Sequence, residues 1–227
     1  MVYTQDTQAK NTTRSLSCIY SPGTFFALDS PELSNNTTCI WLHHSPANKI
    51  LGERITIGLS NLDIYTGRTS IYEFSKDFHH NPCTYDELEK YIAVYKPNET
   101  IIISNLDDDK VDSIIQFANI VSTQIHKIDI RVNSGTHVNS GTRENGLTEL
   151  VIQAQNAEKQ KYQDAIFRKF FDKEEGLITE YYNYCIASQS FCFLLEFIYK
   201  HNPNLVSKID KPIVENYGEK LILANHS

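Results

Sequence analysis

The chain has 227 residues, of which 41% are hydrophobic and 22% are charged, with a formal net charge of −7. This composition is typical of folded globular proteins, predicts one large or two small domains, and excludes a disordered tail. The acidic balance also excludes a chain that binds nucleic acid through its overall charge, because such binding depends on lysine and arginine.

The first half of the chain predicts a β-meander. Alternation over residues 14–20 indicates a strand or extended linker, which ends at the turn-forming residues Ser21, Pro22 and Gly23. Three segments rich in β-branched and aromatic residues predict consecutive strands at 38–43, 54–63 and 68–74. The short link before the third strand contains Gly67, which suits a positive φ in a hairpin turn.

The next segment alternates between helices and strands. Thr84 and Glu87 have the spacing of a capping box and predict a helix that ends before Pro97. The apolar run at 100–104 is typical of a buried parallel strand. A second helix is predicted to start at Asp107–Asp109, and alternation at 125–131 predicts another strand. We therefore expect a mixed sheet with helices packed on it, in the α/β class.

The last third predicts an all-α segment after a loop. Residues 132–148 repeat the tetrapeptide Asn-Ser-Gly-Thr and predict a flexible loop or linker. Helices are predicted at 153–171 and 177–200, and the second is apolar on most faces, so it needs a partner that buries it. An apolar element begins again within 220–227.

The sequence shows neither a secretion signal nor a membrane-spanning segment. The N-terminal residues have neither the basic start nor the apolar core of a signal peptide, and no apolar run approaches about 18 residues. We predict an intracellular protein that is neither secreted nor membrane-bound. Viral, host cytoplasmic, nuclear and mitochondrial sites are not distinguished. Five cysteines without CxxC spacing predict no disulfide framework and no zinc site.

Four groups of residues could carry chemistry by their residue type. Asp107–Asp109 point in different directions on a helix, so we interpret them as a helix start and not a metal site. Asp63 ends a strand, where ribonuclease-H-like nucleases hold metal, but the neighbouring strands supply only Glu73. A turn-capping role is favoured for Asp63. Adjacent histidines at 43–44 and 79–80 have no metal-ligand spacing, and Cys185 and Cys192 are interpreted as core thiols. We predict no catalytic, cofactor-binding or metal-binding residues.

A resemblance then emerges from the order of the segments. Residues 14–26 (RSLSCIYSPGTFF) resemble the exit from the mismatch-binding domain of MutS proteins, with Pro22, Gly23 and Thr24 matching its signature. Residues 57–74 resemble the opening of the MutS connector domain, with Asp63, Thr66 and Gly67 on the matching positions. Residues 185–200 resemble the first core-domain helix, with Ser188 and Ser190 where small residues are usual. The subfamily that it most resembles is that of giant viruses and octocoral mitochondria.

The resemblance implies a ribonuclease-H-like connector domain and a domain division. Residues 1–30 would end the mismatch-binding domain, 31–131 would form the connector, 132–152 a linker, and 153–227 the start of a truncated helical core domain. The family's mismatch-reading FxE and its ATPase motifs are absent from these 227 residues. The chain is therefore expected to be a non-enzymatic fragment, with the apolar helix and the C-terminal element buried by missing partners.

The resemblance also implies a function. The family recognises mismatched DNA under the control of ATP. Its connector transmits the conformational state between the mismatch-reading domain and the ATPase end, and it moves as a rigid body on flexible joints. The implied hinge residues are Pro22, Gly23, Thr24, Asp63, Thr66 and Gly67. ATP and Mg²⁺ belong to the full-length family protein, not to this chain. The expected partners are the rest of a MutS chain or a second subunit, with DNA bound through other domains and no membrane.

Two alternatives stay open. One is a metal-dependent nuclease of ribonuclease-H-like fold, and the other is a stand-alone protein-interaction module that uses the acidic surface and helix 177–200. The connector hypothesis predicts that the chain alone neither hydrolyses ATP nor prefers a mismatch, and that its helical tail makes it self-associate.

Overall fold

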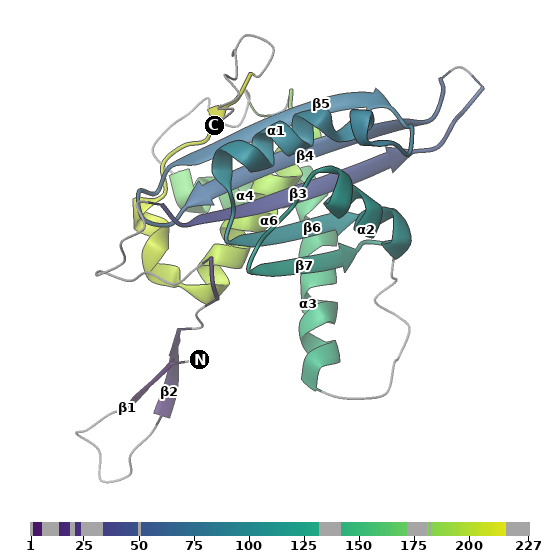
Figure 1. Ribbon diagram of the computed structural model, residues 1–227. Helices are drawn as coiled ribbons and strands as arrows, with labels where there is room; N and C mark the ends of the chain where they lie inside the picture. The colour runs from purple at the N-terminus through teal and green to yellow at the C-terminus, as the bar shows by residue number, and fades with distance from the viewer. Residues whose placement is uncertain are drawn as a thin grey trace.

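The computed structural model describes residues 2–5, 14–18, 21–23, 34–49, 51–131, 142–171, 181 and 183–216. A six-stranded mixed sheet is covered by helices on both faces (Figure 1). This arrangement confirms the predicted α/β class.

Strands and helices alternate much as predicted. The strands are β1 (Val2–Gln5), β2 (Arg14–Cys18), β3 (Asn36–Ser45), β4 (Arg54–Asp63), β5 (Thr69–Asp77), β6 (Glu99–Ser104), β7 (Gln124–Asp129) and β8 (Ile213–Val214). The α-helices are α1 (Asp86–Tyr95), α2 (Asp108–Phe117), α3 (Thr142–Ala157), α4 (Gln160–Phe171) and α6 (Cys185–His201). Two 3₁₀ turns, η1 (Pro82–Tyr85) and η2 (Pro203–Lys208), complete the described elements.

The sheet has the strand order β7-β6-β3-β4-β5-β8. Strands β3, β4 and β5 form the predicted antiparallel meander, whereas β6 and β7 run parallel to β3. Counted from β3, the first five strands take the order 3-2-1-4-5 with the second strand reversed, which is the order of ribonuclease-H-like sheets. Within the described ranges, β1 and β2 pair with each other in a separate two-stranded sheet.

Helices α1 and α2 cover one face of the sheet. Alternate residues of the central strands, such as Ile40, Ile57 and Ile102, point into this layer and are buried. The predicted capping box is wrong, because η1 precedes α1 and takes Thr84 out of the helix. The Thr84 hydroxyl donates to the His79 carbonyl, and the Asn81 side chain caps the 3₁₀ turn instead.

Helices α3, α4 and α6 cover the other face, and α6 packs closest to the strands (Figure 1). A Cβ atom on Gly58 would lie 2.3 Å from the backbone of Ile186, so glycine is needed for the helix to approach this strand. The Glu73 carboxylate accepts hydrogen bonds from the amides of Ile186 and Ala187 in the first turn of α6, at 2.8 and 2.9 Å. These amides have no partner within the helix, and a carboxylate at a helix start is favoured by the helix dipole.

The expectation that this apolar helix lacks a partner inside the chain is wrong. Phe191, Leu194 and Ile198 are all buried, and the Ser190 hydroxyl lies 2.8 Å from both the Ser60 hydroxyl and the Cys39 carbonyl. The apolar face of the sheet buries this helix, which accounts for the apolar residues on most of its faces. The described residues on both sides of the gap at 132–141 share one hydrophobic cluster, while the predicted domain boundaries stay a prediction.

Several predicted boundaries differ from the structure. The helix predicted at 153–171 is two helices, and α3 begins at Thr142, inside the predicted linker. The segment predicted to be all helical also adds β8, which pairs with Ser70 and Ile71 at the edge of β5. The rest of the predicted linker, residues 172–180 and the apolar element at 220–227 lie outside the described residues. Among the described helices, none combines the length and the apolar character needed to cross a membrane.

Candidate functional site

Most of the implied hinge residues lie at one end of the sheet. We call the end at which the parallel strands β3, β6 and β7 begin the amino end, and the opposite end the carboxyl end. Gly23, Asp63 and Gly67 all lie at the amino end, although 44 positions separate the first from the last. Asn35 joins two of these segments, because its side-chain amide donates to the Pro22 carbonyl and its backbone amide donates to Asp63. Thr24 lies outside the described residues.

The turn at residues 21–23 is held by Glu99, the first residue of β6. One oxygen of the Glu99 carboxylate accepts hydrogen bonds from the Ser21 hydroxyl at 2.5 Å and the Gly23 amide at 3.0 Å. The other oxygen lies 2.6 Å from Nε2 of His126 on β7. The Glu99 side chain is completely buried, so this carboxylate depends on these three partners in place of water.

The partners of Glu99 keep it ionised. Burial alone raises the pKa of the Glu99 carboxyl, but hydrogen bonds from His126 and Ser21, the His126 charge and the Gly23 amide together hold it below its ordinary value. The His126 ring also packs edge-on against Phe197 of α6, with the ring centroids 5.7 Å apart. The carboxylate therefore links the incoming turn, two strands and a helix of the opposite layer.

Gly23 is required at this position because of space. A Cβ atom there would lie 2.2 Å from the Thr37 hydroxyl oxygen and 2.6 Å from Cβ of Glu99. The Gly23 carbonyl accepts a hydrogen bond from the same Thr37 hydroxyl at 2.9 Å. The turn is consequently attached to β3 as well as to β6.

Asp63 caps the turn that follows β4, as predicted from its position. Its carboxylate accepts hydrogen bonds from the amides of Asn35 and Tyr65 and from the Thr66 hydroxyl, at 3.0, 3.1 and 2.7 Å. Gly67 ends this turn with a φ of 76°, which is the positive φ expected from the sequence. A Cβ atom on Gly67 would lie 1.8 Å from the Lys208 carbonyl oxygen, so η2 also packs on this turn.

Four asparagines complete the amino end and were not predicted. Asn98 donates to the Asn35 side chain at 2.9 Å, and Asn61 donates to the Asn36 side chain at the same distance. Asn35, Asn36 and Asn61 are buried, and each side-chain amide has a partner. Two signals in the sequence could have indicated this group. They are the adjacent asparagines at 35–36 and the polar Asn61 within the predicted strand at 54–63. We call the group Ser21, Gly23, Asn35, Asp63, Asn98, Glu99 and His126 the amino-end network.

The carboxyl end carries exposed ion pairs. His44 lies 2.6 Å from the Glu53 carboxylate, and Arg131 bridges Asp107 and Asp129 at 2.6 and 2.8 Å. Hydrogen bonds from Arg131 lower the pKa of both aspartates. Asp107 precedes the first residue of α2, as expected for a helix start. Within the described part of the chain, no three His, Cys, Asp or Glu residues are arranged to hold a metal ion.

The cysteines differ from the prediction in one case. Cys192 is buried in the core, and burial raises the pKa of its thiol, as it raises the pKa of Cys39 to about 12. Cys185, predicted to be a second core thiol, is exposed because it is the first residue of α6.

Sequence comparison finds similarity to a viral protein along the whole chain. The chain is 22% identical over 242 aligned residues to a MutS homologue of Acanthamoeba polyphaga mimivirus, described as a DNA mismatch repair protein. The alignment covers 100% of this chain and 20% of that protein, so the chain spans about a fifth of the relative's length. No family model matches the chain.

Among solved structures, the chain is similar to a fowlpox virus resolvase crystallised with Holliday junction DNA. The match has 12% identity and a TM-score of 0.31, and it covers 70% of this chain and 96% of the resolvase chain. A superposition as loose as this does not define a shared site. The sequence comparison therefore supports a relationship to a mismatch-repair protein of the MutS type.

Proposed function

We propose that the chain acts as a non-catalytic connector module of a MutS-type mismatch-repair protein. The observation that carries the proposal is the amino-end network, in which Glu99 attaches the turn at residues 21–23 to β6 and β7. Similarity to a MutS homologue along the whole chain supports the same role.

The network suits a connector that transmits movement, because it holds the turn at residues 21–23 firmly against β6. Two hydrogen bonds from the turn to a buried carboxylate, together with the close contact of Gly23 with Thr37, hold the turn against β6. Helices on both faces stiffen the sheet beyond it. Movement of the preceding segment would then displace the sheet as a rigid body.

A binding experiment tests the module directly. In the mimivirus MutS homologue, the aligned segment is deleted, and binding of the purified chain to the deleted and the intact proteins is compared by surface plasmon resonance. The connector hypothesis expects at least about tenfold tighter binding to the deleted protein, equal to a difference of about 1.4 kcal/mol. Equal affinity for the two proteins, or binding to neither, would count against it.

Activity assays on the chain alone separate the connector from the nuclease alternative. We expect no ATP hydrolysis, no preference for a mismatched duplex over a homoduplex at ~150 mM salt, and no Mg²⁺-dependent cleavage. Strand β3 carries no acidic residue, and the Asp63 carboxylate is used by the turn. Mg²⁺-dependent cleavage that is lost in Asp63→Asn but kept in Asp112→Asn would establish the nuclease instead.

A further inference from the structure

One edge of the sheet is covered where β5 begins but open where β5 ends. β8 pairs in parallel with Ser70 and Ile71, and the Glu215 amide extends this register by donating to the Ile71 carbonyl at 2.8 Å. From Tyr72 to Asp77, no strand of the described part of the chain pairs with the outer side of β5. The second half of β5 is therefore an open edge that an extended segment can join.

The backbone of this open edge has the groups needed for pairing. Phe78 donates its amide to the Glu53 carbonyl at the start of β4, so the even-numbered residues of β5 face β4. The amides and carbonyls of Glu73, Ser75 and Asp77 consequently point outward. No hydrogen bond among the described residues uses these backbone groups. A row of unpaired backbone groups is a template for an added strand.

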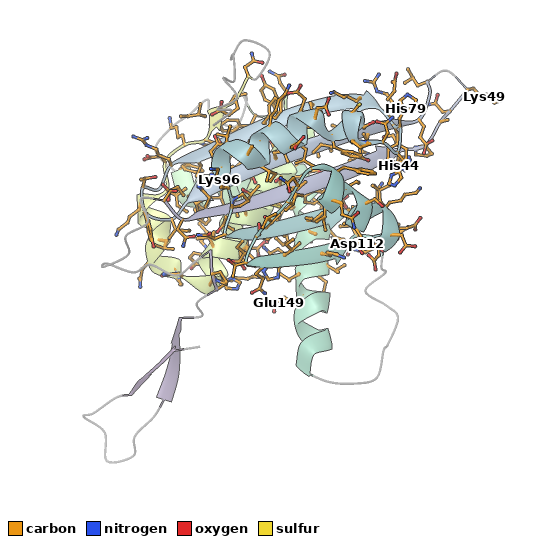
Figure 2. The ribbon with its side chains drawn as sticks, in the orientation of Figure 1. His44, Lys49, His79, Lys96, Asp112 and Glu149 are labelled. Carbon is orange, nitrogen blue, oxygen red and sulfur yellow. The ribbon has the colours of Figure 1, made fainter. Side chains whose placement is uncertain are left out.

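An open groove lies beside the same residues. Its volume is about 520 Å³, and its lining includes Ser75, Lys76 and Asp77. Because side chains alternate along a strand, Ser75 and Lys76 point to opposite faces of the sheet, as expected for a groove that follows an edge. Figure 2 shows His79, which also lines the groove, at the carboxyl end of the molecule, far from Lys96 at the amino end. The open edge of β5 therefore has free space beside it.

The side chains along the open edge differ in chemistry from one position to the next. Phe74 and Lys76 lie on the α1 face of β5, with the Lys76 ammonium 5.9 Å from the centroid of the Phe74 ring. Asp77 lies on the α6 face. Among the described residues, neither Lys76 nor Asp77 has an ionic partner. A matching strand would supply an apolar or aromatic residue, then an anion, then a cation.

The sequence that follows β8 has this order. Residues 217–227 lie outside the described residues, and their first four are Tyr-Gly-Glu-Lys. The register of β8, in which Val214 is opposite Ile71, is continued along β5. Three complementary pairs result: Tyr217 with Phe74, Glu219 with Lys76, and Lys220 with Asp77. A shift by one residue would instead oppose like charges, either two carboxylates or two ammonium groups, which destabilises a strand pair.

We propose that residues 217–220 of this chain bind the open edge of β5 as a parallel continuation of β8. In this arrangement, the amides of Tyr217 and Glu219 face β5, and the amides of Ser75 and Asp77 donate to carbonyls of the added strand. The pairing covers the part of the edge that β8 leaves open. It does not rest on the connector role, because none of these residues belongs to the amino-end network.

Amide hydrogen exchange of the full chain, followed by NMR, tests the pairing. The reference is Lys127 of β7, whose amide points away from β6 at the opposite edge of the sheet and has no described partner. We expect the protection factors of Ser75 and Asp77 to be at least about tenfold higher than that of Lys127, because a paired amide exchanges only when its strand opens. Equal protection at the two edges would overturn the proposal. Protection that rises with protein concentration would also overturn it, because a second copy would then supply the strand.

A charge exchange tests the register. Lys76→Glu places two carboxylates opposite each other, so it should lower the protection of Asp77 about fivefold. Glu219→Lys in the same chain restores an opposite-charge pair and should restore the protection. Lys90→Glu makes the same change of charge at an exposed position of α1 and should have no effect. Equal effects of Lys76→Glu and Lys90→Glu, or no recovery with Glu219→Lys, would contradict the proposed pairing.

Discussion

The two ends of the sheet carry glutamate–histidine pairs of equal length but very different surroundings. Glu99 and His126 lie 2.6 Å apart at the amino end, and Glu53 and His44 lie 2.6 Å apart at the carboxyl end. The Glu99 side chain is 0% exposed, whereas that of Glu53 is 44% exposed. Water competes with the outer pair and stabilises its ions when the pair breaks. Water cannot replace a lost partner of the buried Glu99–His126 pair. Breaking this pair should therefore cost more free energy of unfolding than breaking the exposed Glu53–His44 pair, although the two pairs have the same length.

The same contrast extends to the residues around each pair. At the amino end, the buried amides and carboxylates hydrogen-bond to one another, which is typical of a structural joint. At the carboxyl end, neither Arg54 nor Lys76 has an ionic partner among the residues that the structure describes. The comparison indicates that the buried groups of the amino end hold the fold together, whereas the exposed pair at the carboxyl end contributes less to stability.

Removing the inner carboxylate should have the largest effect. Glu99→Ala leaves the Gly23 amide and His126 without their partner, and we expect a loss of about 3 kcal/mol in the free energy of unfolding, measured with urea. Glu53→Ala is the matched control and should cost less than about 1 kcal/mol. Similar losses in the two variants would remove the distinction between the two ends.

Glycine substitutions give the next largest contrast. Gly67→Ala combines a φ of 76° with a Cβ atom 1.8 Å from the Lys208 carbonyl oxygen, so it should destabilise the protein by more than about 1 kcal/mol. Gly52, at the carboxyl end, has no heavy atom of the described residues, its chain neighbours aside, within 4 Å of its ideal Cβ position, so Gly52→Ala should be neutral or slightly stabilising. Thermal unfolding of both variants provides the measurement, and a stable Gly67→Ala protein would contradict the packing of η2 on this turn.

Acid should weaken the amino end in a way that depends on Glu99. Because its pKa in the folded protein is below its ordinary value of 4.5, Glu99 stabilises the fold fully above about pH 4.5. This stabilisation is lost as the pH falls through the lower pKa of the folded state. Burial raises the pKa of Glu73, which has the opposite effect, so the contribution of Glu99 must be isolated by comparison with Glu99→Gln.

The measurement is the difference in unfolding free energy between the two proteins from pH 7 to pH 3. We expect this difference to be constant down to about pH 4.5 and then to shrink. A difference that grows on acidification would mean that Glu99 is protonated in the folded protein.

The smallest effect is expected from Arg54, at the carboxyl end of the sheet. Arg54 has no described ionic partner, so Arg54→Gln should change the free energy of unfolding by no more than about 0.5 kcal/mol. This small effect sharpens the comparison, because it would separate a cation without a described ionic partner from a residue that holds the fold. A loss comparable to that of Glu99→Ala would assign Arg54 a structural role.

The sequence by itself determined the α/β class and much of the element order. Period-two alternation and apolar runs identified the central strands, because one or both faces of each strand are buried. Asp63 and Gly67 were identified as turn residues because their roles depend on neighbours within a few positions. The start of α2 at Asp107–Asp109 followed from the same local chemistry.

Only the tertiary structure decided which distant segments meet. Nothing local to Glu99 indicates that its carboxylate holds an amide 76 positions earlier, nor that Glu73 caps a helix 113 positions later. The apolar pattern of α6 predicted burial but not the surface that buries it, which proved to be this chain's own sheet. Periodicity reports how much of each element is buried, whereas the identity of the partner depends on contacts between residues far apart in the chain.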